Sequence, residues 1–145
     1  MPSNPHQSLL LWIARKMTAD GFLVAGCDGS LSQGGLWNAL PPPPELAGVR
    51  PDAYGIAPAT GEFAFGEAKT CQDIDTPHTR KQLRVFGRLM HRNGRTACRL
   101  YVAVPRSAAG VLDRVLGQVG LLGARHVVRL HIPDCFVTEN RDECA

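Results

Sequence analysis

Two neighbouring segments, residues 50–57 and 62–69, constrain the fold more than any other part of the sequence. Each has an alternating pattern, and residues 58–61 between them have the composition of a turn. The pattern predicts a β-hairpin in which Ala57 pairs with Glu62. Because strand side chains alternate with a period of two, this register places the following side chains on one face: Asp52, Tyr54, Ile56, Phe63, Phe65, Glu67 and Lys69. One end of that face is apolar, and the other carries two carboxylates and an amine.

Helical and extended patterns surround the hairpin. They predict helices over residues 5–20, 78–92 and 107–121 and strands over residues 22–25, 99–105 and 126–132. Ser107 is a candidate cap for the last of these helices. The resulting order is helix, three strands, helix, strand, helix and strand. It predicts an α/β domain with a mixed central sheet.

A long segment over residues 26–49 interrupts these patterns. It holds several glycines and a run of prolines at residues 41–44, which exclude a helix or a central strand there. Loops of this length in a compact domain are usually functional or poorly ordered. The sequence therefore predicts one domain over residues 1–145, with a Gly/Pro-rich loop at about 26–49 and a loose polar tail at about 133–145.

The composition is that of a globular protein. Apolar residues make up 44% of the 145 residues and charged residues 20%, which argues against a disordered chain. No apolar run is long enough to span a membrane, and residues 1–7 show no signal-peptide pattern, so we expect a cytoplasmic protein without a membrane partner. The five cysteines form no C-x-x-C pair, which argues against a zinc knuckle, and their odd number favours reduced thiols.

The polar end of the hairpin has two interpretations. Asp52, Glu67 and Lys69 could form a cross-strand salt-bridge cluster, which is common and contributes little at a surface. However, Asp52 opposite Glu67 places like charges across a ladder, which destabilises a sheet unless a positive charge lies between them. Lys69 could supply part of that charge. A divalent cation would supply more, because carboxylate oxygens suit Mg²⁺ or Mn²⁺, and the spacing therefore favours a metal site.

These residues resemble the motif of the PD-(D/E)XK nuclease superfamily. The resemblance rests on Pro-Asp at residues 51–52 and on Glu-Ala-Lys at residues 67–69, at the end of the next strand. The superfamily has a restriction-endonuclease-like αβββαβ core, the order read here for residues 5–105. The helix with Gln82 looks like that of the VRR-NUC, RecB-like and Holliday-junction-resolvase-like branch. The resemblance implies this core with a mixed sheet flanked by helices, plus a C-terminal helix and strand.

The resemblance implies a role for each residue of the motif. Asp52 and Glu67 would bind the metal through their side chains, with the backbone carbonyl of Ala68 as a further ligand. Lys69 would hold or help to deprotonate the attacking water and would oppose the charge that develops on the phosphoryl group. Gln82 would steer water or phosphate; otherwise it is a solvated helix residue. A cation that acidifies water and neutralises charge suits the anionic transition state of phosphodiester hydrolysis.

The first helix departs from the pattern of the superfamily. Many members carry a glutamate there as another metal ligand, whereas residues 5–20 contain no Glu. His6 or Gln7 is the nearest substitute, and some RecB-like members use a histidine there; the other interpretation of His6 is a frayed terminal residue. If no residue of this helix approaches the metal, we expect weaker metal binding and a weaker case for a second metal.

Basic residues provide a candidate nucleic-acid contact. The formal net charge is only +3, so the distribution of charge matters more than its total. A stripe on the helix over residues 78–92 has the spacing to meet a phosphate backbone, and comprises Arg80, Arg84, Arg88 and His91. The other interpretation of this stripe is an ordinary solvated face. Trp37, in the long loop, could contact nucleic acid or a protein partner.

Together these features predict a Mg²⁺- or Mn²⁺-dependent DNA endonuclease that hydrolyses phosphodiester bonds. A small domain has little surface for reading a long sequence, so we expect it to recognise junctions, flaps or ends. The resemblance also implies a homodimer as one arrangement. A nuclease subunit that needs a helicase, a transposase or another targeting partner is an alternative. The rival from a different class is a catalytically silent module that binds nucleic acid or a partner on the same fold.

Overall fold

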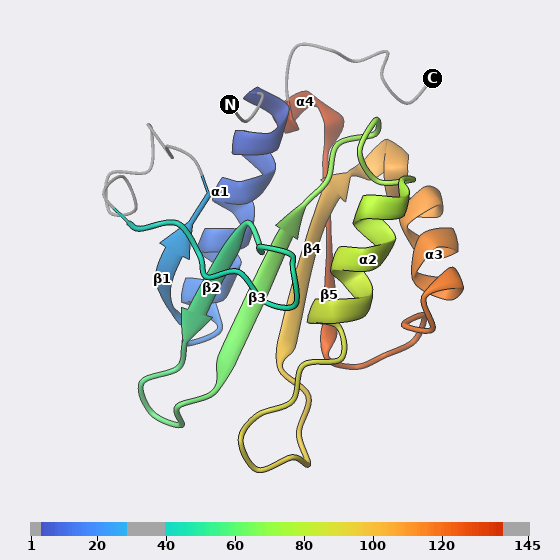
Figure 1. Cartoon of the computed structure of the whole chain (residues 1–145). Coiled ribbons are helices and arrows are strands. Elements are labelled where there is room, and N and C mark those ends of the chain that lie inside the picture. The colour runs from blue at the N-terminus through green and yellow to red at the C-terminus, as the bar shows by residue number, and fades with distance from the viewer. Residues whose placement is uncertain (1–3, 29–39, 138–145) are drawn as a thin grey trace.

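The computed structural model describes residues 4–28 and 40–137 of the chain (Figure 1). Its helices and strands follow the predicted order, with a short 3-10 helix and a short last helix added. The elements are α1 (Asn4–Ala19), β1 (Leu23–Cys27), β2 (Ala53–Ile56), β3 (Phe63–Ala68), α2 (Pro77–Phe86), β4 (Arg99–Pro105), the 3-10 helix η1 (Arg106–Ala108), α3 (Ala109–Gln118), β5 (Val127–Ile132) and α4 (Asp134–Val137).

The strands form one five-stranded sheet in the order β1-β2-β3-β4-β5. β1, β2 and β3 pair antiparallel, whereas β3, β4 and β5 pair parallel. Helices α1 and α4 cover one face of the sheet, and α2 and α3 cover the other (Figure 1). The chain is therefore an α/β protein with a mixed sheet between two layers of helices, as its sequence predicts.

The β2–β3 hairpin has the register expected from the sequence. Ile56 pairs with Phe63, and the N–H of Ala57 donates to the carbonyl oxygen of Glu62 at 2.8 Å. At the other end of the hairpin, the N–H of Asp52 donates to a β3 carbonyl oxygen at 3.0 Å, just before β2 begins. These bonds confirm the predicted pairing. The register is fixed because the alternation of side chains allows only one pairing that buries the apolar face.

Helix α1 packs closely against the end of β3 that leads into the predicted site. Gly66 in β3 permits this approach, because a Cβ there would lie 2.6 Å from Ile13 Cγ2 and 3.3 Å from Met17 Cε. The apolar stripe of α1 is buried in the core on this face of the sheet. Its packing places the first turn of α1, with His6, beside the C-terminal end of β3.

Helix α2 connects β3 to the parallel strand β4 across the other face. Phe86 of α2 stacks on Phe65 of β3 with ring centroids 6.0 Å apart. After β3, the N–H of Lys69 donates to the carbonyl oxygen of Ala103 at 3.0 Å, which continues the parallel pairing with β4. The C-terminal ends of parallel strands meet at one edge of a sheet, where α/β proteins commonly bind ligands.

The predicted helix over residues 78–92 is wrong in length, because α2 ends at Phe86. Gly87 follows, and the chain passes so close to Leu121 that a Cβ at Gly87 would lie 2.4 Å from Leu121 Cδ1. Beyond it, Met90 forms an isolated antiparallel bridge with Ala97. Met90 is 47% exposed and does not lie on an apolar helix face. Tertiary contacts thus override a helical periodicity that continues in the sequence.

The boundaries of other elements also differ from the predictions. Ser107 does not cap α3: it lies in η1, and the cap residue Ala108 has no side-chain cap hydrogen bond. β1 begins and ends later than the predicted strand over residues 22–25. The start of the predicted loose tail is instead α4, where Val137 is buried and Phe136 lies 6.2 Å from the ring centroid of Trp12.

Two further expectations concern cysteines and membranes. Cys27, Cys98 and Cys135 are free thiols, but Cys71 is disulfide-bonded, so the expectation of reduced cysteines is wrong at that residue. Within residues 4–28 and 40–137, no helix has both the length and the apolar character needed to cross a bilayer.

Candidate active site

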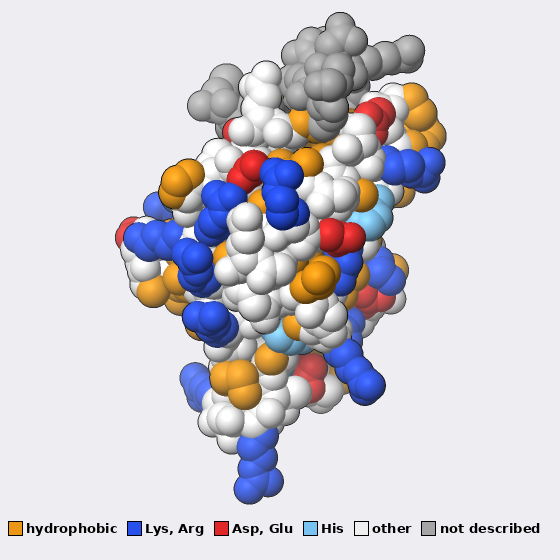
Figure 2. All heavy atoms as spheres, turned by 90° about the vertical axis from the view of Figure 1, so that its right-hand side faces the viewer, with side chains coloured by type: hydrophobic (Ala, Val, Ile, Leu, Met, Phe, Trp, Pro, Cys, Tyr) orange, Lys and Arg blue, Asp and Glu red, His pale blue; other side chains and the backbone are white. Residues whose placement is uncertain are grey.

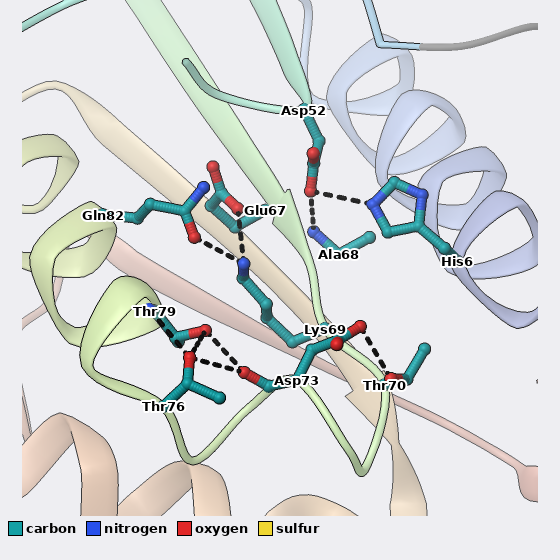
Figure 3. Close-up of polar contacts among 10 residues, drawn as sticks. All are labelled: His6, Asp52, Glu67, Ala68, Lys69, Thr70, Asp73, Thr76, Thr79 and Gln82. Carbon is teal, nitrogen blue, oxygen red and sulfur yellow. Dashed lines mark hydrogen bonds and ion pairs between the residues drawn. The ribbon is translucent and has the colours of Figure 1, made fainter. Parts of the chain in front are cut away.

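Four residues predicted as catalytic lie together at the C-terminal end of β3 (Figure 3). Asp52 comes from the start of the hairpin, Glu67 from β3, Lys69 from the segment after β3, and Gln82 from α2. The ammonium Nζ of Lys69 lies 3.5 Å from Glu67 Oε2 and donates to Gln82 Oε1 at 2.5 Å. The side chain of Lys69 therefore lies between a carboxylate and an amide oxygen.

The carboxylate of Asp52 is held from two directions. The backbone N–H of Ala68 donates to Asp52 Oδ2 at 2.8 Å, and His6 Nε2 lies 3.2 Å from the same oxygen. Figure 3 shows the His6 ring reaching from α1 toward Asp52. These contacts join α1, β2 and β3 at one point. His6 is thus brought to the site, where it contacts a predicted metal ligand.

The carboxylate of Glu67 has the most unusual environment in the site. Its exposed fraction is 0%, yet within the described part of the chain neither of its oxygens accepts a hydrogen bond. Buried polar atoms are nearly always hydrogen-bonded, because losing water without a replacement costs about 1–3 kcal/mol or more for a charged group. The Lys69 ammonium, with Nζ 3.5 Å from Glu67 Oε2, offsets part of this cost.

Burial and neighbouring charges both shift the pKa values of the site. Burial, followed by the negative charge of Asp52, raises the pKa of Glu67 well above its ordinary value, although Lys69 lowers it. Burial also raises the pKa of Asp52, but the hydrogen bond and charge of His6, aided by the Ala68 N–H and Lys69, leave it below its ordinary value. Burial lowers the pKa of His6, and the contact with Asp52 more than reverses this, so that the net shift is upward.

A cavity of about 470 Å³ opens above these residues. Its walls come from the first turn of α1, the segment before β2, and the start of α2. The residues that line it are His6, Asp28, Glu45, Gly48, Val49, Arg50, Asp52, Ala68, Lys69, Asp73, His78 and Gln82. Sequence patterns did not identify Asp28, Glu45, Arg50 or His78 as part of the site; Asp28 and Glu45 lie in the segment over residues 26–49, which has no periodicity.

The predicted metal ligands do not form a cage of side chains. Among residues 4–28 and 40–137, no three or more His, Cys, Asp and Glu side chains are grouped closely enough to hold a metal ion. Mg²⁺ commonly binds through one or two carboxylates and keeps several waters. The predicted ligand set has two carboxylates, Asp52 and Glu67, and the backbone carbonyl of Ala68, so a metal at this site stays a prediction.

A threonine-rich cap fixes the helix that carries Gln82. Thr76 caps α2 by accepting from the N–H of Thr79 at 3.1 Å, and Pro77 follows in the first turn. The hydroxyl of Thr79 also donates to the carbonyl oxygen of Asp73 at 2.6 Å. These bonds appear in Figure 3, beside the Lys69–Gln82 contact that the helix positions.

The predicted basic stripe does not form one helical face, because α2 ends before Arg88 and His91. Arg80 pairs with Asp75 and donates to Gln118 Oε1, and Arg88 reaches the carbonyl oxygen of Val119 at 3.4 Å. His91 Nδ1 lies 3.5 Å from Cys98 Sγ. Arg84 is exposed on α2. Trp37 lies outside the described residues.

Basic side chains nevertheless gather on one side of the molecule. Figure 2 shows the face on the side of α2 and α3, with Lys and Arg side chains spread over it and acidic side chains scattered among them. Asp75 partly neutralises this face, since it pairs with both Arg80 and Arg114. Basic side chains nevertheless predominate on the face shown in Figure 2.

The chain matches no protein-family model, no curated protein and no solved structure.

Proposed function

We propose that this protein is a Mg²⁺- or Mn²⁺-dependent deoxyribonuclease of the PD-(D/E)XK type, with a restriction-endonuclease-like core. The observation that carries the proposal is the carboxyl group of Glu67, which is fully buried, accepts no hydrogen bond among the described residues and has Lys69 Nζ at 3.5 Å. It lies beside Asp52 and Lys69, the other residues of the motif. The resemblance of the motif and the order of the elements add support.

The carboxylates of Asp52 and Glu67 would hold the metal, together with the carbonyl oxygen of Ala68. A divalent cation bound there would lower the pKa of a bound water and neutralise charge on the phosphodiester. The N–H of Ala68 would keep one oxygen of Asp52 oriented, since it already donates to Oδ2 at 2.8 Å. His6 would hold the same carboxylate from the side of α1.

Lys69 would act on the water and on the phosphate. Its Nζ could donate a hydrogen bond to the attacking water and oppose the negative charge that develops on the phosphoryl oxygens. Gln82 accepts from this Nζ, so it would limit the positions that the ammonium can occupy. A side chain with three donors can serve Gln82, Glu67 and a substrate oxygen at the same time.

The limited surface of the described domain and the resemblance of its motif suggest a substrate and partners. A domain of 145 residues offers little surface for reading a long sequence, so we propose recognition of junctions, flaps or ends. A homodimer would add contact area and a second active site. Delivery by a helicase, a transposase or another targeting protein would likewise add contact area with the DNA.

A cleavage assay tests the proposal. Supercoiled, linear, single-stranded and branched DNA are incubated with Mg²⁺, Mn²⁺ or EDTA, and products are resolved on denaturing gels. We expect cleavage with either metal, and a loss of at least about 10³-fold with Lys69→Ala or Glu67→Gln. Arg95→Ala is the control, because Arg95 lies in the turn between α2 and β4, at the opposite end of the sheet (Figure 1). Equal cleavage by Lys69→Ala would overturn the proposal.

One observation favours the rival, a silent binding module. Asp52 Oδ2 already has two partners, the N–H of Ala68 and the ring of His6, so this carboxylate is satisfied without a metal. DNA binding of submicromolar strength, with no cleavage under any metal, would establish this alternative.

A further inference from the structure

We infer that Asn93 is a site of spontaneous deamidation, at which the surrounding turn promotes conversion of the asparagine into a mixture of aspartyl and isoaspartyl residues. This modification is independent of the proposed nuclease function. Its site is the connection between α2 and β4, where Asn93 is followed directly by Gly94.

Asn93 lies at the tip of a short hairpin-like turn. The turn is closed by a backbone hydrogen bond from the N–H of His91 to the carbonyl oxygen of Thr96 at 2.9 Å. Residues 92–96 are all exposed, and the turn lies at the opposite end of the sheet from the candidate active site (Figure 1). Water therefore has free access to the side chain of Asn93.

Gly94 supplies the nucleophile of the reaction. In deamidation the backbone nitrogen of the next residue attacks the side-chain carbon Cγ of asparagine, and a side chain on that next residue hinders the approach. Gly94 has no side chain, and a Cβ placed on it would meet no other atom within 4 Å. Its nitrogen is therefore sterically accessible, although its hydrogen bond to the carbonyl oxygen of His91, at 2.9 Å, must open first.

Two backbone N–H groups hold the oxygen on which negative charge develops during the attack. Asn93 Oδ1 accepts from the N–H of Arg95 at 2.9 Å and from the N–H of Thr96 at 3.1 Å. When the nitrogen bonds to Cγ, this oxygen becomes the oxyanion of a tetrahedral intermediate. Donors already aimed at such an oxygen lower the barrier to its formation, so the hydrogen bonds that order the turn also favour the reaction.

The leaving group also has a partner in the turn. Asn93 Nδ2 donates to Thr96 Oγ1 at 3.1 Å, so this hydroxyl can pass a proton from water to the departing nitrogen. The Gly94 nitrogen gives its proton to water, the bond from this nitrogen to Cγ forms, the Cγ–Nδ2 bond breaks, and ammonia leaves a succinimide ring. One water then adds to either carbonyl of the ring, which gives an aspartyl or an isoaspartyl residue at position 93.

The charges of this segment favour the reaction and give it a consequence. Residues 76–112 contain eight Lys and Arg residues and no Asp or Glu, and Arg92 and Arg95 flank the Asn-Gly pair. Neighbouring positive charge stabilises both the deprotonated nitrogen and the oxyanion. The product places a carboxylate in a segment that has none, and lowers the formal net charge of the chain from +3 by one unit.

Peptide mapping by mass spectrometry tests the inference. The native protein and a synthetic peptide of residues 89–97 are kept in neutral buffer over several weeks, and each is analysed for a mass gain of about 1 Da, with aspartyl and isoaspartyl products separated by chromatography. We expect Asn93 to react in the native protein at least as fast as in the peptide. Asn4 is the internal control, because the proline after it has no N–H and cannot attack. A slower reaction in the native protein than in the peptide overturns the inference, since the fold would then protect Asn93.

A pair of threonine variants tests whether the turn itself promotes the reaction. Thr96→Val removes the hydroxyl that accepts from Asn93 Nδ2 and keeps the N–H that donates to Oδ1. Thr60→Val is the matched control, because it removes a hydroxyl that accepts a backbone N–H in the turn between β2 and β3. We expect Thr96→Val to slow deamidation at position 93 several-fold in the native protein and Thr60→Val to leave the rate unchanged. Equal rates in both variants, with both proteins folded by circular dichroism, would contradict the role of the Thr96 hydroxyl.

Discussion

Among single residues, Glu67 combines full burial, a neighbouring negative charge and two oxygens without donors in the described chain. A side chain chosen for stability would not be a carboxylate here, because an apolar or amide group would avoid the cost of desolvating a charge. Groups held at such a cost are typical of functional sites. The same reasoning gives Glu67 measurable effects on stability, on pH dependence and on metal binding.

Glu67→Gln should stabilise the metal-free protein at alkaline pH. Because the pKa of Glu67 is raised, its contribution to the free energy of unfolding is fully present below about pH 4.5 and is lost as the pH rises through the raised pKa. His6, whose pKa is also raised, changes stability with the same sign. We expect Glu67→Gln to add about 1–2 kcal/mol at pH 8 and to flatten the pH dependence.

Urea denaturation in EDTA between pH 4.5 and 9 measures this effect. Glu45→Gln is the control, because Glu45 lines the same cavity but its side chain is exposed, and we expect it to change stability little. A Glu67→Gln protein that is less stable than the parent at every pH would show that the carboxylate contributes to the fold.

Gln82→Leu should lower kcat and leave KM nearly unchanged. The substitution removes the oxygen that accepts from Lys69 Nζ at 2.5 Å, so the ammonium is no longer confined. Loss of such a supporting contact typically reduces activity about 10–100-fold. Gln118→Leu removes a surface amide that accepts from Arg80, and steady-state kinetics should show no comparable change. A larger effect on KM than on kcat would place Gln82 in substrate binding instead.

At the scale of elements, the packing of α1 against β3 connects the fold to the site. Gly66 is adjacent to Glu67, and its lack of a side chain sets the distance between helix and strand. The first turn of the same helix delivers His6 to Asp52. A change in this packing should therefore alter both stability and the position of the carboxylates.

Gly66→Ala should destabilise the protein by about 1–3 kcal/mol. The added Cβ would lie 2.6 Å from Ile13 Cγ2, so either the Ile13 side chain or α1 itself must shift. Gly110→Ala is the matched control, because a Cβ there meets nothing within 4 Å and alanine favours the helical conformation, which should add about 0.4–1 kcal/mol. Thermal unfolding followed by circular dichroism compares the two. An equal change of Tm in both variants would show that close packing at Gly66 is unimportant for stability.

At the scale of the whole molecule, a metal that binds only the folded state should stabilise all of it. If Mg²⁺, Mn²⁺ or Ca²⁺ binds at Asp52 and Glu67, the stabilisation follows RT ln(1 + [L]/Kd), which is about 2.7 kcal/mol at 100 times Kd. We expect Tm to rise with metal concentration in the parent and to stay constant in Glu67→Gln and Asp52→Asn. Sodium chloride at matched ionic strength controls for screening. An equal rise in both variants would place the metal elsewhere.

Local sequence patterns determined the parts of this protein that depend on neighbouring residues. The alternation over residues 50–69 predicted the hairpin register, because a shift by one residue would turn every apolar side chain to the wrong face. The same register predicted that Asp52, Glu67 and Lys69 would meet. The α/β class and the mixed sheet followed from the order of helical and extended patterns.

Contacts between residues that lie far apart in the sequence decided the features that local patterns did not predict. The end of α2 depends on the approach of Leu121 to Gly87, and the His6–Asp52 contact depends on how α1 packs against the sheet. Residues 40–50 have no periodicity, and their position comes from a hydrogen bond to β1 and from burial of Val49. Local propensity contains no information about such partners, so only the tertiary structure determines the depth of the site and the shape of its entrance.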